Sequence, residues 1–371
     1  MIENSKKILI ISNYADKLHI MRKELIKDLI ERNYNVILAG SELKDGINVD
    51  YFSESIISQF LPISRFNINP LKEIKVLLSI KKILKNIKPD IVLVYGIKII
   101  PSCVIGSRMA GINCVFSYIN GAGSLFIKDS LKIRCLRLVA FPMIKLSLSL
   151  STKVFFQNND DILEFINKKL LKKNKGIVVN GSGVNMSEYP PTKVKGKTTF
   201  SIIGRLSVEK GIQEFIKAAE IVKSRYPNVN FIVAGKLESE SLGEMLNKAI
   251  NENIISYLGE IQNSNEVLND TTVFVLPSYR EGLPRVNLEA MSKKRALITT
   301  DTIGCRDTVI DGYNGFLVPI KNVDLIVERM IEFINDSSLA IRMGENGYKL
   351  CKEKFEVNKV NSFLIKKMCK E

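Results

Sequence analysis

The stretch SYREGLPRVNLEAMSKKRALITTDTIGC, residues 278–305, contains a turn and a helix around which the rest of the chain can be placed. The apolar run Val273–Leu276 comes just before it and predicts a buried strand. The polar turn then brings Glu281, and a helix predicted to begin at Pro284 brings Glu289. In an open α/β sheet a ligand lies beyond the carboxyl ends of the strands, near the first helical amides. We therefore expect one carboxylate on the loop and the other on the helix, both facing a ligand.

Strands and helices alternate throughout this half of the chain, which predicts a parallel sheet. The predicted strands are Thr198–Ile203, Asn230–Ala234, Ile255–Leu258 and Thr272–Leu276. The predicted helices between them are Gly211–Tyr226, Ser241–Asn251 and Asn263–Leu268.

The first half opens with the same alternation. A β-branched run predicts a strand at Lys7–Ser12, helical periodicity predicts a helix at Asp16–Arg32, and a second strand is predicted at Asn35–Ala39. The loop between the first strand and the helix lacks the GxGxxG pattern of dinucleotide-binding folds. A dinucleotide-dependent oxidoreductase is therefore the weaker reading of this α/β pattern.

The length of 371 residues is too great for one ordinary core and predicts two domains. Residues 180–197 are rich in glycine, proline and lysine and lack periodicity, as is typical of an interdomain segment. We place the first domain at 1–185, a linker at 186–197 and the second domain at 198–354, with the terminal helix in 355–371 packing back on the first. The predicted fold is α/β, with two Rossmann-like, doubly wound parallel-sheet domains facing a central cleft.

The net charge of +15 and the pI of about 9.4 favour acidic partners such as phosphorylated substrates, anionic lipid surfaces or nucleic acid. A compositional bias toward lysine explains the charge equally well. The six cysteines have no CxxC spacing, so neither a metal site nor a disulfide framework is indicated, and a reduced, cytoplasmic protein fits best. No apolar segment reaches the roughly 18–20 residues that cross a bilayer.

Two stretches combine apolar and basic residues. Leu71–Lys88 reads as an amphipathic helix with six lysines, and Lys128–Lys145 combines basic residues with an apolar block around Pro142. Both patterns suit an anionic lipid surface. An ordinary crossover helix explains the first pattern, and a core helix broken at Pro142 explains the second.

The segment GRLSVEKG, residues 204–211, predicts an anion site. It leaves a strand and enters a helix, and Arg205 and Lys210 flank that entry, where free amides and the helix dipole already favour an anion. Together with Glu281 and Glu289, these cations suit a ligand that carries both phosphates and hydroxyls. A sugar nucleotide has both.

Five motifs of the second half, in order and spacing, resemble the retaining glycosyltransferases of family four, which share the two-domain GT-B fold. They are GRLSVEKG (204–211), FIVAGKL (231–237), SYLGEI (256–261), VFVLPSYREGLPRVNLEAM (273–291) and TTDTIGCRDTVIDGYNGFLVP (299–319). The likeness is looser in the first half, where GSGVNMSEYPP (181–191) matches the family's domain junction. Within the family the chain is similar to bacterial enzymes that act on undecaprenyl-diphosphate-linked sugars.

The resemblance implies a role for each matched residue of the second half. Arg205 and Lys210 would bind the donor diphosphate, Glu289 the ribose hydroxyls, and Glu281, as the catalytic residue, the hydroxyls of the donor sugar. The remaining donor-binding residues would be Gly204, Glu260, Ile261, Gly282, Leu283, Pro284 and Arg285. Lys293 and Lys294 depart from the small residues usual in the family, which we expect only to alter a turn.

The acceptor side is expected in the first half, at the predicted strand ends. Its candidates are Asn13, His19, Lys98, Asn120, Gly121, Gly123 and Ser124. Many family members carry a histidine before the glycine of this loop, and here the residue is Asn120, which puts a histidine-assisted arrangement in doubt. His19, the only histidine, either touches substrate or is simply exposed.

The implied activity is metal-independent, retaining transfer of a hexose or N-acetylhexosamine, with GalNAc from UDP-GalNAc as the favoured donor. The acceptor would be a lipid-diphosphate-linked glycan in bacterial surface polysaccharide assembly. The enzyme would work at the inner face of the cytoplasmic membrane, with no cofactor, no metal and no nucleic-acid partner. The alternatives are a transferase with a soluble acceptor, the oxidoreductase, and a nucleic-acid binder suggested by charge alone.

Overall fold

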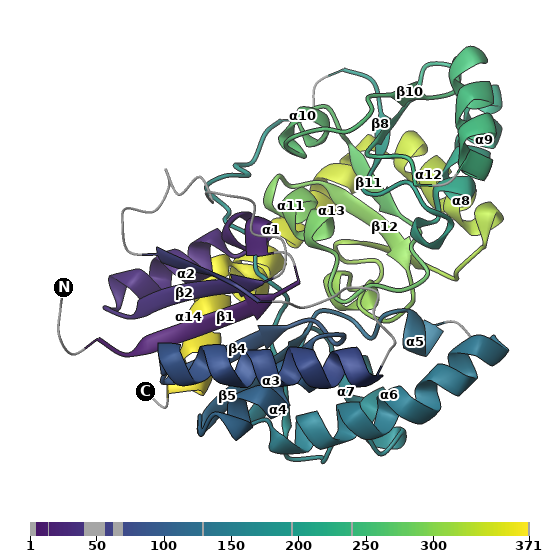
Figure 1. The fold of residues 1–371 in the computed structure, drawn as a ribbon. Coiled ribbons are helices and arrows are strands. Elements are labelled where there is room, and N and C mark those ends of the chain that lie inside the picture. Colours follow the sequence, from purple (N-terminus) through teal and green to yellow (C-terminus); the bar gives the residue numbers. More distant parts are fainter. Residues whose placement is uncertain are drawn as a thin grey trace. The chain divides into compact units, whose positions relative to one another are not determined.

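The computed structural model describes residues 5–13, 15–40, 56–61, 70–127, 130–193, 196–238 and 240–369. They form two compact units. Unit 1 comprises Met1–Ser182 and Val360–Glu371, and unit 2 comprises Gly183–Lys359. Each unit is a parallel sheet with helices on both faces, so the predicted fold class of two doubly wound α/β sheets is confirmed (Figure 1).

Unit 1 has a seven-stranded sheet in the order β3-β2-β1-β4-β5-β6-β7, and all of its strand pairs are parallel. Its strands are β1 (Lys7–Ser12), β2 (Asn35–Gly40), β3 (Ile56–Phe60), β4 (Ile91–Tyr95), β5 (Cys114–Ile119), β6 (Lys153–Phe156) and β7 (Gly176–Val178). The chain order reverses between β1 and β4, so the loops that follow these two strands meet at a topological switch point.

Alternate residues of these strands face two separate cores. Leu9, Val92 and Val115 pack with helices α3 (Pro70–Ile87), α4 (Ile100–Met109), α6 (Leu131–Leu150) and α7 (Asn159–Asn167). Their neighbours Ile8, Leu93 and Phe116 face the opposite core. Helices α1 (Ala15–Met21), α2 (Lys23–Glu31) and α14 (Val357–Cys369) cover that second face. The short α5 spans Ser124–Ile127.

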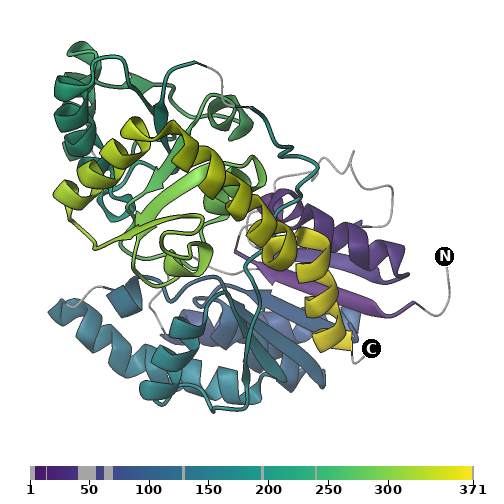
Figure 2. The ribbon, with the colours of Figure 1, turned by 180° about the vertical axis from the view of Figure 1, so that it is seen from behind.

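The last helix of the chain therefore completes the unit that the first residues begin. Figure 2 shows α14, in yellow, lying along the sheet of unit 1. Val360, Leu364, Ile365 and Met368 are almost fully buried in its core. The Asn361 amide also donates a 2.8 Å hydrogen bond to the Asp28 carboxylate of α2. Burial raises the pKa of that carboxyl group.

The predicted single helix over residues 16–32 is wrong, because Arg22 leaves helical geometry at φ −125° and separates α1 from α2. The break carries the Arg22 guanidinium inward, where it lies 4.7 Å from the ring centroids of Tyr95 and Tyr118. Helical periodicity could not indicate this break, because both tyrosines belong to distant strands.

Unit 2 has a six-stranded parallel sheet in the order β10-β9-β8-β11-β12-β13. Its strands are β8 (Thr199–Ile203), β9 (Asn230–Ala234), β10 (Ser256–Tyr257), β11 (Val273–Leu276), β12 (Ala296–Thr300) and β13 (Gly315–Val318). One face packs on α8 (Ile212–Arg225), α9 (Glu240–Asn251), α12 (Val323–Asn335) and α13 (Ser337–Leu350). The other packs on α10 (Asn265–Leu268) and α11 (Arg285–Ser292). Here the chain order reverses between β8 and β11.

Residues 189–192 are held against the rest of unit 2 by three side chains at the end of α11 and just after it. The Ser292 hydroxyl donates to the Tyr189 carbonyl at 2.7 Å, and the Lys293 ammonium donates to the Pro190 carbonyl at 3.2 Å. The Arg295 guanidinium donates to the Thr192 carbonyl at 2.9 Å. Lys293, which is only 2% exposed, therefore anchors this segment, and the expectation that it merely alters a turn is wrong.

The two places where the chain passes between units are bonded to each other. The Val184 amide donates to the Phe355 carbonyl, and the Val357 amide donates back to the Val184 carbonyl. A Cβ on Gly183 would lie 2.7 Å from the Val357 Cα, so only glycine fits there. Both crossings thus leave unit 2 from one pair of hydrogen-bonded segments.

The cysteines differ in their accessibility, which predicts their order of alkylation. Cys135 is exposed, whereas Cys103, Cys305 and Cys351 are buried. Burial raises the pKa of Cys305 and of Cys351 to about 12, so their thiolate fraction is very low at neutral pH. Iodoacetamide labelling read by peptide mass spectrometry should modify Cys135 first and the three buried thiols only after urea is added. Early labelling of Cys351 in the native protein would contradict this burial.

Among the described residues, no helix combines the length and the apolar character needed to cross a membrane.

Candidate active site

The loops that follow β8 and β11 meet at the switch point of unit 2, where a doubly wound sheet holds its ligand. The first loop contains a short 3-10 helix, Val208–Lys210, that leads through Gly211 into α8. The second contains Ser278, Tyr279 and Glu281. The Tyr279 amide donates to the Glu209 carbonyl at 2.8 Å, and the Ser278 Oγ lies 3.1 Å from the same oxygen. The two loops are therefore in direct contact.

Gly211 makes this close approach possible. Its φ of +74° lies in the left-handed region, and a Cβ there would lie 2.2 Å from the Pro277 carbonyl oxygen. No side chain fits at that distance. The second glycine of the GRLSVEKG motif, Gly211, is thus required by the contact between the two loops.

Lys210 and Glu281 form the charged centre of the site. The Lys210 ammonium lies 2.5 Å from Glu281 Oε1, and the two side chains are 22% and 14% exposed. The Ser278 hydroxyl donates to the same carboxylate oxygen at 2.7 Å. The lysine thus holds the carboxylate in place while both groups keep some access to solvent. We predicted from the sequence that Lys210 and Glu281 bind one ligand, and in the structure the two side chains are in direct contact.

Tyr279 fixes the loop from its other side. Its hydroxyl donates to Glu214 Oε1 of α8 at 2.6 Å. Burial and the neighbouring Glu214 carboxylate raise the pKa of the Tyr279 phenol well above its usual value. From β12 and the loop after it, the Thr300 and Thr302 hydroxyls donate to the carbonyls of Ser278 and Tyr279. Side chains from two further elements therefore define where Glu281 lies.

Glu289 lies on α11 and is only 6% exposed. Its Oε2 accepts a 2.6 Å hydrogen bond from the Ser264 hydroxyl, and its Oε1 lies 3.0 Å from Arg285 Nε. The second contact is an ion pair without hydrogen-bond geometry, because the Nε–H finds no acceptor. Both carboxylate oxygens thus have protein partners, and a ligand hydroxyl would share or replace one of them.

Arg205 pairs with a carboxylate that was not among the predicted site residues. Its guanidinium contacts the Glu238 carboxylate at 3.1 Å, and the two side chains are 68% and 38% exposed. Glu238 comes from the loop after β9, which the Leu206–Leu237 bridge holds beside the loop after β8. No local sequence pattern marks Glu238 as this partner.

We expect Arg205→Ala to change the free energy of unfolding by less than about 0.5 kcal/mol, because exposed ion pairs contribute little. Chemical unfolding of Arg205→Ala and of the matched variant Glu238→Ala measures this. A loss of anion binding in Arg205→Ala can then be attributed to the missing guanidinium. A destabilisation of several kcal/mol would instead give the residue a structural role.

The other predicted donor-side residues lie on neighbouring loops. Gly204 directly follows β8, and its carbonyl oxygen would be 1.7 Å from a Cβ on Gly235. Leu283 and Pro284 are buried, and Pro284 is the N-cap of α11, so the helix begins at Arg285. Gly282 lies in the turn before them. Glu260 is exposed and Ile261 is half-buried in the loop after β10.

The predicted acceptor-side residues all belong to unit 1 and follow three of its strands. Asn13 follows β1, with His19 on α1, and Lys98 follows β4. These two strands form the switch point of that sheet. Asn120, Gly121 and Gly123 follow β5, and Ser124 begins α5. Gly123 has φ +70°, which favours glycine there.

Sequence reasoning did not single out Ser278, Glu214 or Ser264, although each bonds a predicted loop or carboxylate. Ser278 stands beside Glu281 in the quoted motif and could have been found there. The other two act only through tertiary contacts. No group of three or more His, Cys, Asp or Glu side chains that could hold a metal ion occurs in the described part of the chain.

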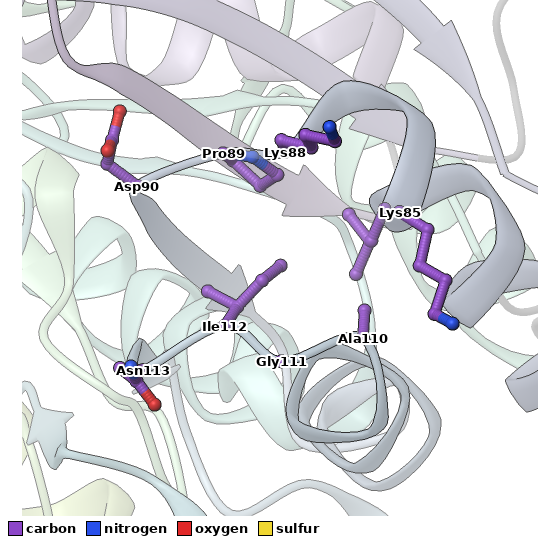
Figure 3. A pocket seen from close by; sticks show the side chains of 9 residues that line it. Lys85, Lys88, Pro89, Asp90, Ala110, Gly111, Ile112 and Asn113 are labelled. Carbon is purple, nitrogen blue, oxygen red and sulfur yellow. The ribbon is translucent and has the colours of Figure 1, made fainter.

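A pocket of about 520 Å³ opens elsewhere, between the carboxyl ends of α3 and α4 in unit 1 (Figure 3). It adjoins Asp90, which precedes β4, so it lies at the opposite edge of the sheet from Asn13 and Lys98. Figure 3 shows Lys85 and Lys88 extending in different directions, and the Asp90 carboxylate accepts the Lys7 amide at 2.7 Å. The pocket thus lacks the convergent charges of the loops in unit 2.

Two family models match the chain. The model described as "Glycosyl transferases group 1" matches residues 188–350, which contain the charged pair and Glu289. The model described as "Glycosyl transferase 4-like" matches residues 7–158, most of the sheet of unit 1.

Two curated relatives span most of their own length and most of this chain. A Campylobacter jejuni protein named N,N'-diacetylbacillosaminyl-diphospho-undecaprenol alpha-1,3-N-acetylgalactosaminyltransferase is 27% identical over 353 residues, 91% of each chain. An Escherichia coli protein named UDP-Gal:alpha-D-GlcNAc-diphosphoundecaprenol alpha-1,3-galactosyltransferase is 28% identical over 342 residues, 87% of this chain and 84% of its own.

Solved structures share the fold at low identity. HepE of Anabaena, in complex with UDP and glucose, has a TM-score of 0.79 at 15% identity and covers 99% of this chain and 100% of its own. A sucrose-phosphate synthase from Thermosynechococcus elongatus also has a TM-score of 0.79, at 16% identity over 97% of each chain. These likenesses concern the fold alone, two α/β units that are each built on a parallel sheet.

Proposed function

This chain belongs to the glycosyltransferases, and we propose that it transfers a sugar from a nucleoside diphosphate to a glycan carried on undecaprenyl diphosphate. It has a group 1 domain in its second half and a 4-like domain in its first half. The observation that carries the donor half of this proposal is the Lys210–Glu281 pair at the switch point of unit 2. Its cation suits phosphate oxygens and its carboxylate suits sugar hydroxyls.

The bond that breaks joins the anomeric carbon to the donor diphosphate. Lys210, Arg205 and the amides at the start of α11 would neutralise the charge that develops on the leaving diphosphate, which needs no metal ion. Glu281 would accept hydrogen bonds from the donor sugar, and Glu289 from the ribose. We propose a retaining course, in which the acceptor hydroxyl attacks from the side of the leaving phosphate and gives its proton to that phosphate.

The acceptor and the sugar are proposed from the relatives. Both curated relatives are named for acceptors on a diphospho-undecaprenol lipid, which favours this acceptor class over a soluble glycan. The Campylobacter jejuni name favours UDP-GalNAc as donor, and the Escherichia coli name makes UDP-Gal the second candidate. Such an enzyme would work at the inner face of the cytoplasmic membrane.

The test is transfer from a panel of UDP-sugars to a short glycan on a polyprenyl diphosphate, with EDTA present and with a water-soluble glycan in parallel. We expect product from one donor, on the lipid-linked acceptor, with its anomeric configuration retained by NMR. Activity that EDTA abolishes would overturn the metal-independent mechanism. Equal transfer to the soluble glycan would favour the alternative acceptor class.

A further inference from the structure

Helix α6 carries apolar side chains on the side that faces solvent as well as on the side that faces the core. Ile144 and Leu148 are buried against the sheet of unit 1. On the outer side, Leu131 is 79% exposed, Leu138 77%, Val139 55% and Leu146 51%. The outer positions recur every three or four residues and also include Cys135 and Pro142, so they form one continuous stripe. Pro142 lies on this outer stripe. Helix α6 continues through it from Leu131 to Leu150, so the predicted break at Pro142 is wrong.

Basic side chains border the stripe. Arg134 and Lys145 are exposed on the same side of α6, which has no acidic residue. Lys128, included in the predicted segment, lies outside the described residues. Helix α3 lies on the same face of the sheet, packs against α4 as α6 does, and exposes Lys75, Lys82 and Lys85 with Ile74 and Leu78. We call these exposed residues of α3 and α6 the α3–α6 surface.

We propose that the α3–α6 surface lies on an anionic lipid membrane, with the leucines of α6 in the boundary between headgroups and acyl chains and the lysines of α3 beside lipid phosphates. An apolar stripe bordered by cations is the composition that holds a helix in the plane of a membrane surface. The net charge of +15 acts in the same direction. A second copy of the chain fits less well, because it would bring the same lysines against each other.

This inference deepens the proposed function, because an acceptor on a polyprenyl lipid is confined to a bilayer. Lys75, Lys82 and Lys85 of the predicted amphipathic helix are exposed, as the inference requires. The inner sides of α3 and α6 pack on the core of unit 1, and the proposal assigns lipid binding to their outer sides.

The experiment uses the absence of tryptophan from this chain. The single-tryptophan variant Leu138→Trp is titrated with phosphatidylcholine vesicles that contain or lack phosphatidylglycerol. Its matched control is Ile341→Trp on α13 of unit 2, where the natural residue is 66% exposed. We expect the emission of Leu138→Trp to shift to the blue with anionic vesicles and to be quenched by brominated acyl chains, with no change in the control.

Two further measurements separate lipid binding from its alternatives. In the wild type, anionic vesicles should slow the alkylation of Cys135. The double variant Lys82→Gln/Lys85→Gln should bind anionic vesicles at least about tenfold more weakly than the wild type. This difference in affinity should become smaller as salt is added. A blue shift of Leu138→Trp that grows with protein concentration and needs no vesicles would overturn the proposal in favour of a second copy.

Failure of this inference can be told apart from failure of the proposed function. Transfer to the lipid-linked acceptor in detergent, without any response of position 138 to vesicles, would contradict the membrane-binding role of the α3–α6 surface but not the proposed activity. Insertion of position 138 into vesicles, with no transfer from any UDP-sugar, would contradict the proposed activity but not the membrane-binding surface.

Discussion

A Lys210→Met variant is expected to lose about 10²-fold or more in kcat/KM of sugar transfer, which corresponds to roughly 3 kcal/mol of transition-state stabilisation. The ammonium is the cation that contacts Glu281, at 2.5 Å, and the proposed mechanism gives it the leaving diphosphate as a second partner. Steady-state kinetics with the preferred UDP-sugar measures the loss. The matched control is Lys248→Met, because that lysine also pairs with a glutamate, Glu252 at 3.9 Å, but is 66% exposed on α9.

The same pair allows catalysis to be separated from stability. Removal of Lys210 alone leaves the Glu281 carboxylate, 14% exposed, with the Ser278 hydroxyl as its remaining partner, and should destabilise unit 2. In Lys210→Met/Glu281→Gln that charge is gone, so stability should return while activity stays low. If the double variant recovers activity together with stability, the pair is structural and its proposed role in transfer is wrong.

A Gly211→Ala variant is expected to be destabilised by roughly 3 kcal/mol or more and to lose most of its activity. The new methyl group would lie 2.2 Å from the Pro277 carbonyl oxygen, so the loops after β8 and β11 must move apart. Those loops carry Lys210 and Glu281. Urea unfolding followed by circular dichroism measures the stability, and transfer assays measure the activity.

Gly312→Ala separates the steric clash from the backbone strain. Gly312 has φ +73°, close to the +74° of Gly211, but a Cβ there would meet nothing within 4 Å. Alanine at position 312 should therefore cost only the left-handed conformation, about 1 kcal/mol, with activity unchanged. Equal effects of the two substitutions would mean that the loop after β11 yields freely to the methyl group.

The fold could be predicted because its strands are continuous apolar runs with helices of clear periodicity between them. Lys7–Ser12 and Val273–Leu276 are read correctly for that reason. Strand β3, Ile56–Phe60, was missed because its apolar residues are few and a polar stretch precedes it. The break at Arg22 was missed because its cause, the Tyr95 and Tyr118 rings, is far away in the sequence.

In the candidate site, only those charged residues that follow the end of a predicted strand could be predicted from the sequence. That rule brings Lys210 and Glu281 to one edge of a sheet, but it cannot tell which charges touch. Glu289 on α11 pairs with Ser264, which precedes α10, and Arg205 pairs with Glu238. No local pattern marks either partner. The roles given to Lys210, Glu281 and Arg205 remain predictions that the variants above test.

The placement of α14 sets the order in which the two units can fold during synthesis on the ribosome. Unit 2 is one continuous segment, Gly183–Lys359, so its whole core is made before the part of α14 that belongs to unit 1. Unit 1 is begun first, yet Leu364 and Ile365, which close one of its two cores, are made only after the whole of unit 2. Until then α1 and α2 alone cover this sheet face of the nascent first half, so part of it stays exposed, the kind of apolar surface that chaperones protect. For the same reason, a fragment cut after Ser182 should be insoluble, whereas one that begins at Gly183 keeps its own core.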